Sequence, residues 1–461
     1  MSELELDKNS MGFSESVVMG VAGTAPAFSI AATTGTLIAA VGHLSVASLL
    51  YCGLIMFGIT IAYLHLNRIH THAGAAYAWV GLVFHPVLGF FAGWSLLVAS
   101  AVFMVSGTIP AATSTLALFS DELPKNITLV SVVAACWLIL VGAIIIKGTK
   151  LAAIFQVVNT LVEFVSLVLI IGGIFWFYWN SPAHSFTRED FAFTEFTPEL
   201  FASGALVALF FFWGWDVTLN LSEETAGGEE SSGRGAIWAM IIMLVLFMAS
   251  TAAVQLSMSD AEIEKAGTNV LLALAQKVFP DPYSYIAVIA VLLSTVGTLE
   301  TTILQFTSTM FAKGRDGVLH PRYAVLHAKW KTPWVSTLVI VAIGLVLLFF
   351  ATFLPNVNTV IDVSVKAIGF LVAFYYGLTG FACAWLFRKK GQTSIKNFIM
   401  FIFWPVVSAA FMAYIIFYSV KTFDLTTTLL GVGGILFGII PLVINRIVRK
   451  NQVNSRNGDK K

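Results

Sequence analysis

The stretch from Met19 to Ser29 reads MGVAGTAPAFS, and it interrupts the first long apolar run of the chain. Gly20, Gly23 and Pro26 fall within seven residues of a sequence that otherwise resembles a membrane-spanning helix. Proline has no backbone N–H, and its ring blocks the carbonyl four residues earlier, here that of Ala22. Backbone groups freed at this depth are tolerated only where they face protein, water or a ligand. We therefore predict local unwinding in this segment.

A second interruption lies at residues 210–220, which read FFFWGWDVTLN. One break alone could be a packing notch, because membrane helices often contain glycine and proline. Here, however, two breaks are set five apolar runs apart, as an inverted repeat of five plus five helices requires, and the second carries an acid. This pattern indicates a substrate site. We place that site at Ala22, Gly23, Thr24, Ala25, Pro26, Phe210, Trp213, Gly214, Trp215 and Asp216.

The composition around these breaks is that of a membrane protein. Of 461 residues, 58% are hydrophobic and 11% are charged, and the mean hydropathy is +0.86. Soluble domains carry roughly 25% charged residues, so this chain could not cover a water-soluble surface of its size. A soluble enzyme and a disordered protein are excluded, and the net charge of +1 excludes a nucleic-acid binder.

Apolar runs long enough to cross a bilayer as helices fix the expected topology. We find twelve, at about 17–41, 46–66, 84–108, 127–146, 151–178, 199–222, 236–257, 283–312, 333–353, 357–387, 394–419 and 425–447. With both termini inside, 20 of the 26 Lys and Arg residues fall in inner segments, five in outer segments, and Lys366 within a span. This bias predicts cytoplasmic termini and a multi-pass protein of the plasma or inner membrane.

No feature of the sequence indicates catalysis, a metal or a cofactor. Cys52, Cys136 and Cys383 each stand alone in an apolar run, without the spacing of a metal site or a disulfide framework. The chain has no nucleotide-binding P-loop and no paired-histidine zinc motif. We therefore expect no catalytic residues, no bound metal and no cofactor, and no transport driven by ATP.

Several marks together resemble a bacterial member of the amino acid–polyamine–organocation superfamily, the amino-acid permeases. They are the break in span 1, Gly214-Trp215-Asp216 with the SEET of residues 222–225, Gly93-Trp94, and the inner loop GRDGVLHP of residues 314–321. The resemblance implies an all-α, leucine-transporter-type fold. In it, residues 17–178 and 199–387 are the inverted repeats, residues 394–447 form two added spans, and residues 1–16 and 448–461 are cytoplasmic, the latter as a basic tail.

The resemblance also implies how a substrate would be held, between spans 1, 3, 6, 8 and 10. Backbone N–H groups of the broken span 1 would bind a substrate carboxylate, and span 6 carbonyls would bind its amine. Phe210 matches a position where the family often places an aromatic gate. This chain has Thr24-Ala25-Pro26 where a third glycine is commoner, and the proline removes one carboxylate donor. An ordinary α-amino acid is the leading ligand class.

Three acids lie deep within apolar spans: Glu163, Asp216 and Glu300. Each costs about 2.5–3.5 kcal/mol or more at the bilayer centre unless it is paired or solvated, which favours functional roles. Asp216 either caps the half-helix after its break or contacts a substrate ammonium. Glu163 stands where some proton-coupled relatives have a lysine. We expect Glu163 and Glu300, with Thr301, to share one site beside span 1 that holds a proton or Na⁺.

Charged residues at the inner ends of the spans suggest a closure on the cytoplasmic side. Glu223 and Glu224 follow span 6, and we expect them to form inner-gate salt bridges with Lys or Arg of the loops. His65, His70 and His72 lie at the inner end of span 2, where we expect them to be solvated.

Taken together, the sequence predicts a secondary active transporter of amino acids or related amines, working by alternating access and coupled to protons. The alternatives are a polyamine or organic-cation carrier or exchanger, and a Na⁺-coupled symporter. An ion channel fits twelve spans with paired breaks less well. The expected partners are a small-molecule substrate, the lipid bilayer and H⁺ or Na⁺, with no nucleic acid.

Overall fold

A computed structural model describes residues 6, 8–120, 122–354, 357–445 and 447. Within these residues the chain is helical and forms no sheet; one isolated bridge pairs Met11 with Thr225. The expected basic tail, 448–461, lies outside the described residues, as do residues 1–5 and 7 of the expected N-terminal segment.

The twelve predicted runs are all helical. The helices, in chain order, are α1 (Phe13–Gly23), α2 (Pro26–Val41), α3 (Ser45–Ile69), α5 (Pro86–Ala117), α6 (Ile127–Ile146), α7 (Thr149–Tyr178), α8 (Pro198–Phe211), α9 (Val217–Asn220), α10 (Gly228–Ser257), α13 (Ile286–Arg315), α14 (Trp334–Ala351), α15 (Val357–Leu386), α18 (Trp404–Ser419) and α20 (Gly434–Phe437). Short helices α17 (Ile395–Phe398) and α19 (Leu425–Thr428), each followed by a π-helical turn, lead into α18 and α20.

Ten helical segments of the described chain are long and apolar enough to cross a membrane. This number differs from the twelve predicted runs for two physical reasons. The segment from Phe13 to Ile69 joins the first two runs, because a 3-10 turn at Gly42–Leu44 links them. The sixth run is divided into α8 and α9, and α8 is too short to span alone.

Both predicted breaks are present. Helix α1 ends at Gly23 and α2 begins at Pro26, with Ala25 between them in a left-handed conformation at φ 48°. Proline at the first position of a helix loses no hydrogen bond, since that N–H has no intrahelical partner. In the second break, Gly214 has φ +109°, a conformation that residues with side chains rarely adopt.

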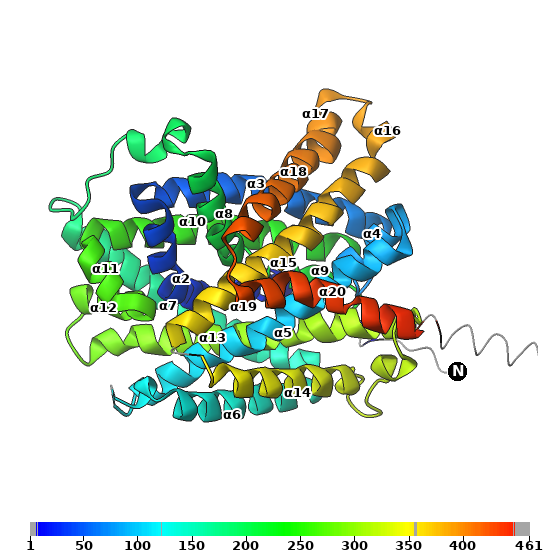
Figure 1. The fold of residues 1–461 in the computed structure, drawn as a ribbon, viewed down its shortest axis with the longest axis horizontal. Coiled ribbons are helices and arrows are strands. Elements are labelled where there is room, and N and C mark those ends of the chain that lie inside the picture. Colours follow the sequence, from blue (N-terminus) through cyan, green and yellow to red (C-terminus); the bar gives the residue numbers. More distant parts are fainter. Residues whose placement is uncertain (1–5, 7, 121, 355–356, 446, 448–461) are drawn as a thin grey trace, which may run out of the picture.

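The broken helices lie against a group of unbroken ones. Helix α13 packs against α5, α7, α2 and α1, while α6 and α14 pack together and against α5. Figure 1 shows α6 and α14 at the lower edge, beneath α5 and α13. Four α-helices of the described chain lie outside the predicted runs: α4 (Ala76–Val83), α11 (Asp260–Ala266), α12 (Val270–Val278) and α16 (Arg388–Gly391). Helices α11 and α12 lie at the left of Figure 1, and α4 lies at the right.

Candidate substrate and coupling site

The two breaks meet at Gly23 and Gly214. A Cβ atom added to either glycine would collide with the carbonyl oxygen of the other. The sequence therefore brings its two interrupted helices together through two residues without side chains. Of the residues predicted for the site, all ten are buried.

The N–H groups in the first break are all engaged. The N–H groups of Thr24 and Ala25 donate to the carbonyl oxygens of Val21 and Ala22 at the end of α1. The first three N–H positions of an α-helix have no intrahelical acceptor. In α2 the first of them is Pro26, the second is Ala27, which donates to Glu163 Oε1 (2.8 Å), and the third is Phe28, which donates to Ser294 Oγ (3.2 Å). The expected donors for a substrate carboxylate are thus occupied by the protein itself.

Glu163 is placed by α7 and fully buried, at 1% exposure. Its carboxylate lies at the start of α2, where the partial positive charge of the helix N-terminus stabilises an anion. One side chain therefore joins the broken first span to an unbroken neighbour. The sequence showed an acid at position 163 in place of a lysine. It did not show that the Ala27 N–H donates to this acid.

Helix α13 contacts the first break through Thr298, whose hydroxyl donates to the Ala22 carbonyl (2.5 Å). Thr301, the residue that the sequence favoured, donates instead to Thr298 of its own helix (3.0 Å). At about 100° per residue, Glu300 lies some 200° around α13 from Thr298, and so on the side away from the breaks. Its Oε1 is buried and has no hydrogen-bond partner.

The structure separates Glu163 from Glu300, contrary to the prediction of one shared position. Gly297 of α13 packs directly against the Gln156 amide of α7, and Ser294 faces Glu163, so the two helices run antiparallel. Glu163 is seven residues beyond Gln156 and Glu300 three residues beyond Gly297. These offsets add to about 15 Å along the helix axes at 1.5 Å per residue, and the Ser294–Glu163 contact, six residues from Glu300, gives about 9 Å.

Asp216 faces α15 and does not cap α9. It stands at the N-cap position, yet its side chain accepts no capping hydrogen bond. Instead, Oδ2 accepts a hydrogen bond from the Tyr375 hydroxyl (3.0 Å), which in turn accepts one from Trp213 Nε1 (2.8 Å). Within the described part of the chain, Oδ1 is buried and accepts no hydrogen bond of ordinary geometry, although Gln305 and Tyr376 are neighbouring donors. The capping alternative is therefore not what this structure shows.

Four aromatic rings surround this acid, and we call them with Asp216 the Asp216 cluster: Tyr63, Trp215, Tyr375 and Tyr376. Tyr63 lies 5.2 Å from Trp215 and 5.7 Å from Tyr376 between ring centroids. Trp215 and Tyr376 stack at 5.5 Å. Among the described residues, no Lys, Arg or His forms an ion pair with Asp216.

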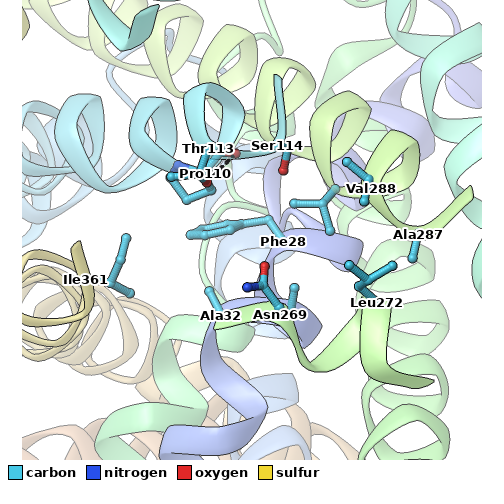
Figure 2. A pocket seen from close by; sticks show the side chains of 12 residues that line it. Phe28, Ala32, Pro110, Thr113, Ser114, Asn269, Leu272, Ala287, Val288 and Ile361 are labelled. Atoms are coloured by element: carbon cyan, nitrogen blue, oxygen red, sulfur yellow. Dashed lines mark hydrogen bonds between the residues drawn. The ribbon is translucent and has the colours of Figure 1, made fainter. Parts of the chain in front are cut away.

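A second set of rings, the aromatic layer, separates the Asp216 cluster from the end expected to face outside. Phe28 lies 6.1 Å from Phe210 and 6.2 Å from Phe103, and Phe103 lies 5.6 Å from Trp213. Figure 2 shows Phe28 projecting into a small cavity of about 40 Å³. Phe210 packs in this aromatic layer with Phe28 and Phe103, two phenylalanines that sequence reasoning did not single out.

Beyond that cavity is a larger one of about 560 Å³, and the two share Ala32 and Ile361 as lining residues. Three acids line the larger cavity, Asp260, Glu264 and Asp362, and the described residues around it include no basic one. We call this cavity the acidic mouth. Asp362 also pairs with Lys366 one helical turn away (2.7 Å).

The opposite end is closed by charged groups. Arg315 donates two hydrogen bonds of 2.7 Å to Glu223, which also accepts one from the Ala73 N–H (2.8 Å). His72 lies 3.4 Å from Asp316 and is buried rather than solvated as expected. Burial favours a higher pKa for Glu223, but the Arg315 and Ala73 bonds hold that pKa below its usual range. We call this network the inner closure.

The N-terminal segment crosses the inner closure. The N–H groups of Ser10 and Met11 donate to the Glu224 carbonyl (2.9 and 3.4 Å), and Ala226 donates back to Met11 (2.8 Å). Leu6 is buried among Ala73, Tyr77, Phe311, Ala312 and Ala324. Glu224 takes part in this contact through its backbone carbonyl oxygen, which could not be predicted from the sequence.

Sequence reasoning did not single out several side chains that contact the predicted site residues or form the inner closure. They are Phe28, Phe103, Ser294, Arg315 and Tyr375. Adjacent tyrosines at 375 and 376 inside an apolar run were the one available indication, because a buried phenol needs a hydrogen-bond partner. Serine and phenylalanine are common in membrane helices and gave none.

The amino acid permease family model matches residues 11–440. A low-affinity putrescine importer of Escherichia coli K12 is 25% identical over 360 residues, which cover 76% of this chain and 75% of the importer. A branched-chain amino acid permease of Lactococcus lactis is 26% identical, covering 78% of each chain. A methylthioribose transporter of Bacillus subtilis is 24% identical, covering 74% and 76%.

The family match covers nearly the whole chain, and the relatives named above are membrane transporters or permeases. The family match and the ten long apolar helices of the described chain show a multi-pass protein of the cell membrane. The chain therefore belongs to the amino acid permease family, within the amino acid–polyamine–organocation superfamily.

Proposed function

We propose that this permease is a secondary active transporter of small amine-bearing molecules, amino acids or related amines, that works by alternating access and is driven by protons. The observation that carries the proposal is the contact of two interrupted helices at Gly23 and Gly214, beside a buried acid. The relatives support the substrate range, since their names include putrescine, branched-chain amino acids and methylthioribose.

For the architecture we propose twelve spans in a leucine-transporter-type fold, with residues 17–178 and 199–387 as inverted repeats and both termini in the cytoplasm. The paired breaks five spans apart and the distribution of Lys and Arg support this arrangement. The acidic mouth and the small cavity at Phe28 form the outer approach, and the inner closure blocks the other end. This conformation therefore belongs to the outward-facing half of the cycle.

Proton coupling is assigned to Glu163 alone. It lies between α7 and the start of α2, so its protonation changes how firmly the mobile half-helix is held. Glu300 lies about 9–15 Å away along the helix axes and on another face of α13, as argued above.

Uptake into proteoliposomes tests the transport function. We expect saturable uptake that unlabelled substrate inside the vesicles accelerates, because a carrier returns faster when loaded. A channel shows neither saturation in the same range nor acceleration from the far side. Linear, unaccelerated flux across the accessible substrate range would contradict the proposal.

The inner closure carries a prediction of its own. Glu223→Gln should favour opening to the inside and raise the rate of exchange with internal substrate about tenfold, equivalent to about 1.4 kcal/mol. Because the pKa of Glu223 is below its usual range, its ion pair persists at and above pH 5.5 and is lost only as the pH falls through that lowered pKa.

The difference between Glu223→Gln and the unmodified protein should thus stay constant between pH 5.5 and 8. Exchange rates measured across that range check it. Lys125→Gln, which breaks an exposed pair with Glu122 at the other end, is the matched control and should leave exchange unchanged. A pH-dependent difference for Glu223→Gln would mean that the inner closure, and not Glu163, senses pH.

A further inference from the structure

An apolar groove of about 570 Å³ lies on the surface at the inner end of α15, far from the two breaks in the sequence. Three residues of α15 line it at helical spacing, Leu378, Phe381 and Trp385, and Arg388 follows at the same spacing at the start of α16. Side chains three and four residues apart share one face of a helix. One stripe of side chains therefore runs from apolar residues to a cation at its inner end. We call this cavity the Arg388 groove.

The walls of the Arg388 groove come from other segments of the chain. Phe84 and Leu88 line it from the turn between α4 and α5 and from the start of α5, and Val406 lines it from α18. Helix α15 packs against α4, α5 and α18. Figure 1 shows α15 and α18 leading to α16 and α17 at their ends. An occupant of the groove would thus contact three segments that are distant in sequence.

The groove has the depth of one leaflet of a bilayer. Leu378 and Arg388 are ten residues apart, about 15 Å along a helix. This is half of the ~30 Å hydrocarbon core. Phe84, Leu88, Phe381 and Trp385 are between 38% and 55% exposed in the groove and at its rim. The groove therefore offers an apolar surface to an acyl chain of the inner leaflet, with the cation at the level of the headgroups.

The cation at the end of the groove has donors to spare. Arg388 donates one N–H to the Trp385 carbonyl (2.7 Å), and its guanidinium carbon lies 4.6 Å from the centroid of the Trp385 ring. It opens the segment RKKGQTSIK of residues 388–396, which has four basic residues and no acidic one. Among the residues that the structure describes, none of these four forms an ion pair. A guanidinium of this kind suits a phosphate group, which it can bind through two N–H donors.

Charge, and not the apolar wall, decides which lipid the groove would select. Lipid tails are as apolar as the side chains that they contact, so an apolar groove by itself favours no lipid over another. A second groove of about 150 Å³, between α5, α14 and α15, has no charged residue among its described lining residues. The Arg388 groove differs by its cation and by the basic segment that follows. Basic clusters next to the cytoplasmic end of a membrane helix attract anionic headgroups.

We propose that the Arg388 groove binds one anionic phospholipid of the cytoplasmic leaflet, with an acyl chain along α15 and the phosphate at Arg388. This inference rests on the orientation proposed above and not on the transported substrate. Its test measures binding alone, so its failure leaves the transport function as it stands.

Native mass spectrometry of the full-length protein tests the proposal with two lipids that share their acyl chains, anionic phosphatidylglycerol and zwitterionic phosphatidylcholine. We expect phosphatidylglycerol to bind at least ~10-fold more tightly, because each basic residue near the headgroup contributes about fivefold. Inorganic phosphate should not displace it. Equal binding of the two lipids would mean that the groove does not distinguish headgroups, and displacement by inorganic phosphate would mean an anion site without a lipid. Either result overturns the proposal.

The role of Arg388 is tested by removing its charge. Arg388→Gln should lower the affinity for phosphatidylglycerol about fivefold and leave that for phosphatidylcholine unchanged. Arg322→Gln is the matched control, since it removes an exposed guanidinium that does not line the groove. An unchanged lipid preference in Arg388→Gln, or an equal loss in Arg322→Gln, overturns the assignment of the phosphate to Arg388.

The groove itself is tested by filling it. Val406→Trp should lower the affinity for both lipids by at least ~10-fold, because the ring takes the space of the acyl chain. Val407→Trp makes the same change at the next residue, which is 41% exposed and does not line the groove, and should leave binding unchanged. Melting temperature and monodispersity are recorded for each variant, and Leu88→Trp fills the groove from the opposite wall if Val406→Trp does not fold. Unchanged lipid binding in a folded, groove-filling variant overturns the proposal.

Discussion

Gly214→Val should abolish substrate binding, lowering affinity by at least ~100-fold, about 2.8 kcal/mol. Gly214 lies at φ +109°, and a Cβ there would occupy the space of the Gly23 carbonyl. A branched side chain must therefore push the two breaks apart, and it does so where both backbones line the site. Overpacking of this kind typically costs 1–3 kcal/mol of stability as well. Gly23→Val should act in the same way from the other helix.

Binding by calorimetry and saturable uptake are the measurements, with melting temperature and monodispersity recorded for each variant. Gly172→Val is the matched control, because a Cβ at Gly172 of α7 meets nothing within 4 Å. It makes the same chemical change in a membrane helix without touching the breaks, so its uptake should be normal. Normal saturable uptake by both Gly23→Val and Gly214→Val would remove the two breaks from the site.

The all-helical architecture and the two breaks could be predicted from sequence because their causes are local. Long apolar runs make helices in a membrane, where backbone polar groups have no water to pair with. Pro26 and the glycines around it act within a few residues, so α1 ends and α2 begins close to where the sequence indicates. The positive φ of Gly214 also has a local cause, because glycine adopts that conformation readily.

The contacts of the site could not be predicted, because they join residues far apart in the chain. Ala27 donates to Glu163 across 136 positions, and Tyr375 donates to Asp216 across 159. Such partners depend on the rotation of each helix about its axis, which the apolar pattern of a fully buried helix leaves undetermined. Glu300 shows the consequence: its depth was predicted, yet it lies on the face of α13 away from the breaks.

The same contacts change which ligand the sequence favours. From the sequence, Pro26 removes one N–H donor for a substrate carboxylate, and an α-amino acid remained the leading class of ligand. In the structure the neighbouring donors are also taken, by Glu163 and Ser294. One additional acid on α7 thus alters the expected chemistry of the first break.

Glu163→Gln should keep substrate binding but uncouple uptake from an imposed pH gradient. The glutamine still offers a side-chain oxygen to the Ala27 N–H, so the start of α2 keeps its partner. It cannot take up or release a proton at any pH of interest. If Glu163 carries the coupling proton, an inward gradient should no longer raise the uptake rate, while binding affinity should stay within about twofold of the unmodified protein.

The measurement is initial uptake into proteoliposomes with and without the gradient, at a fixed membrane potential and at fixed Na⁺. Glu300→Gln is the control, since it removes a carboxyl of the same kind and burial, 2% exposed against 1%, at another level of the membrane. Uptake that a Na⁺ gradient drives in the unmodified protein would replace the proton with Na⁺, held by oxygens such as those of Glu163 and Thr298. Uptake by Glu163→Gln that the pH gradient still drives fully, with unchanged pH dependence, would exclude Glu163 from coupling. Because Glu163 contacts the N-terminus of α2, the proposed coupling through it requires no second acid.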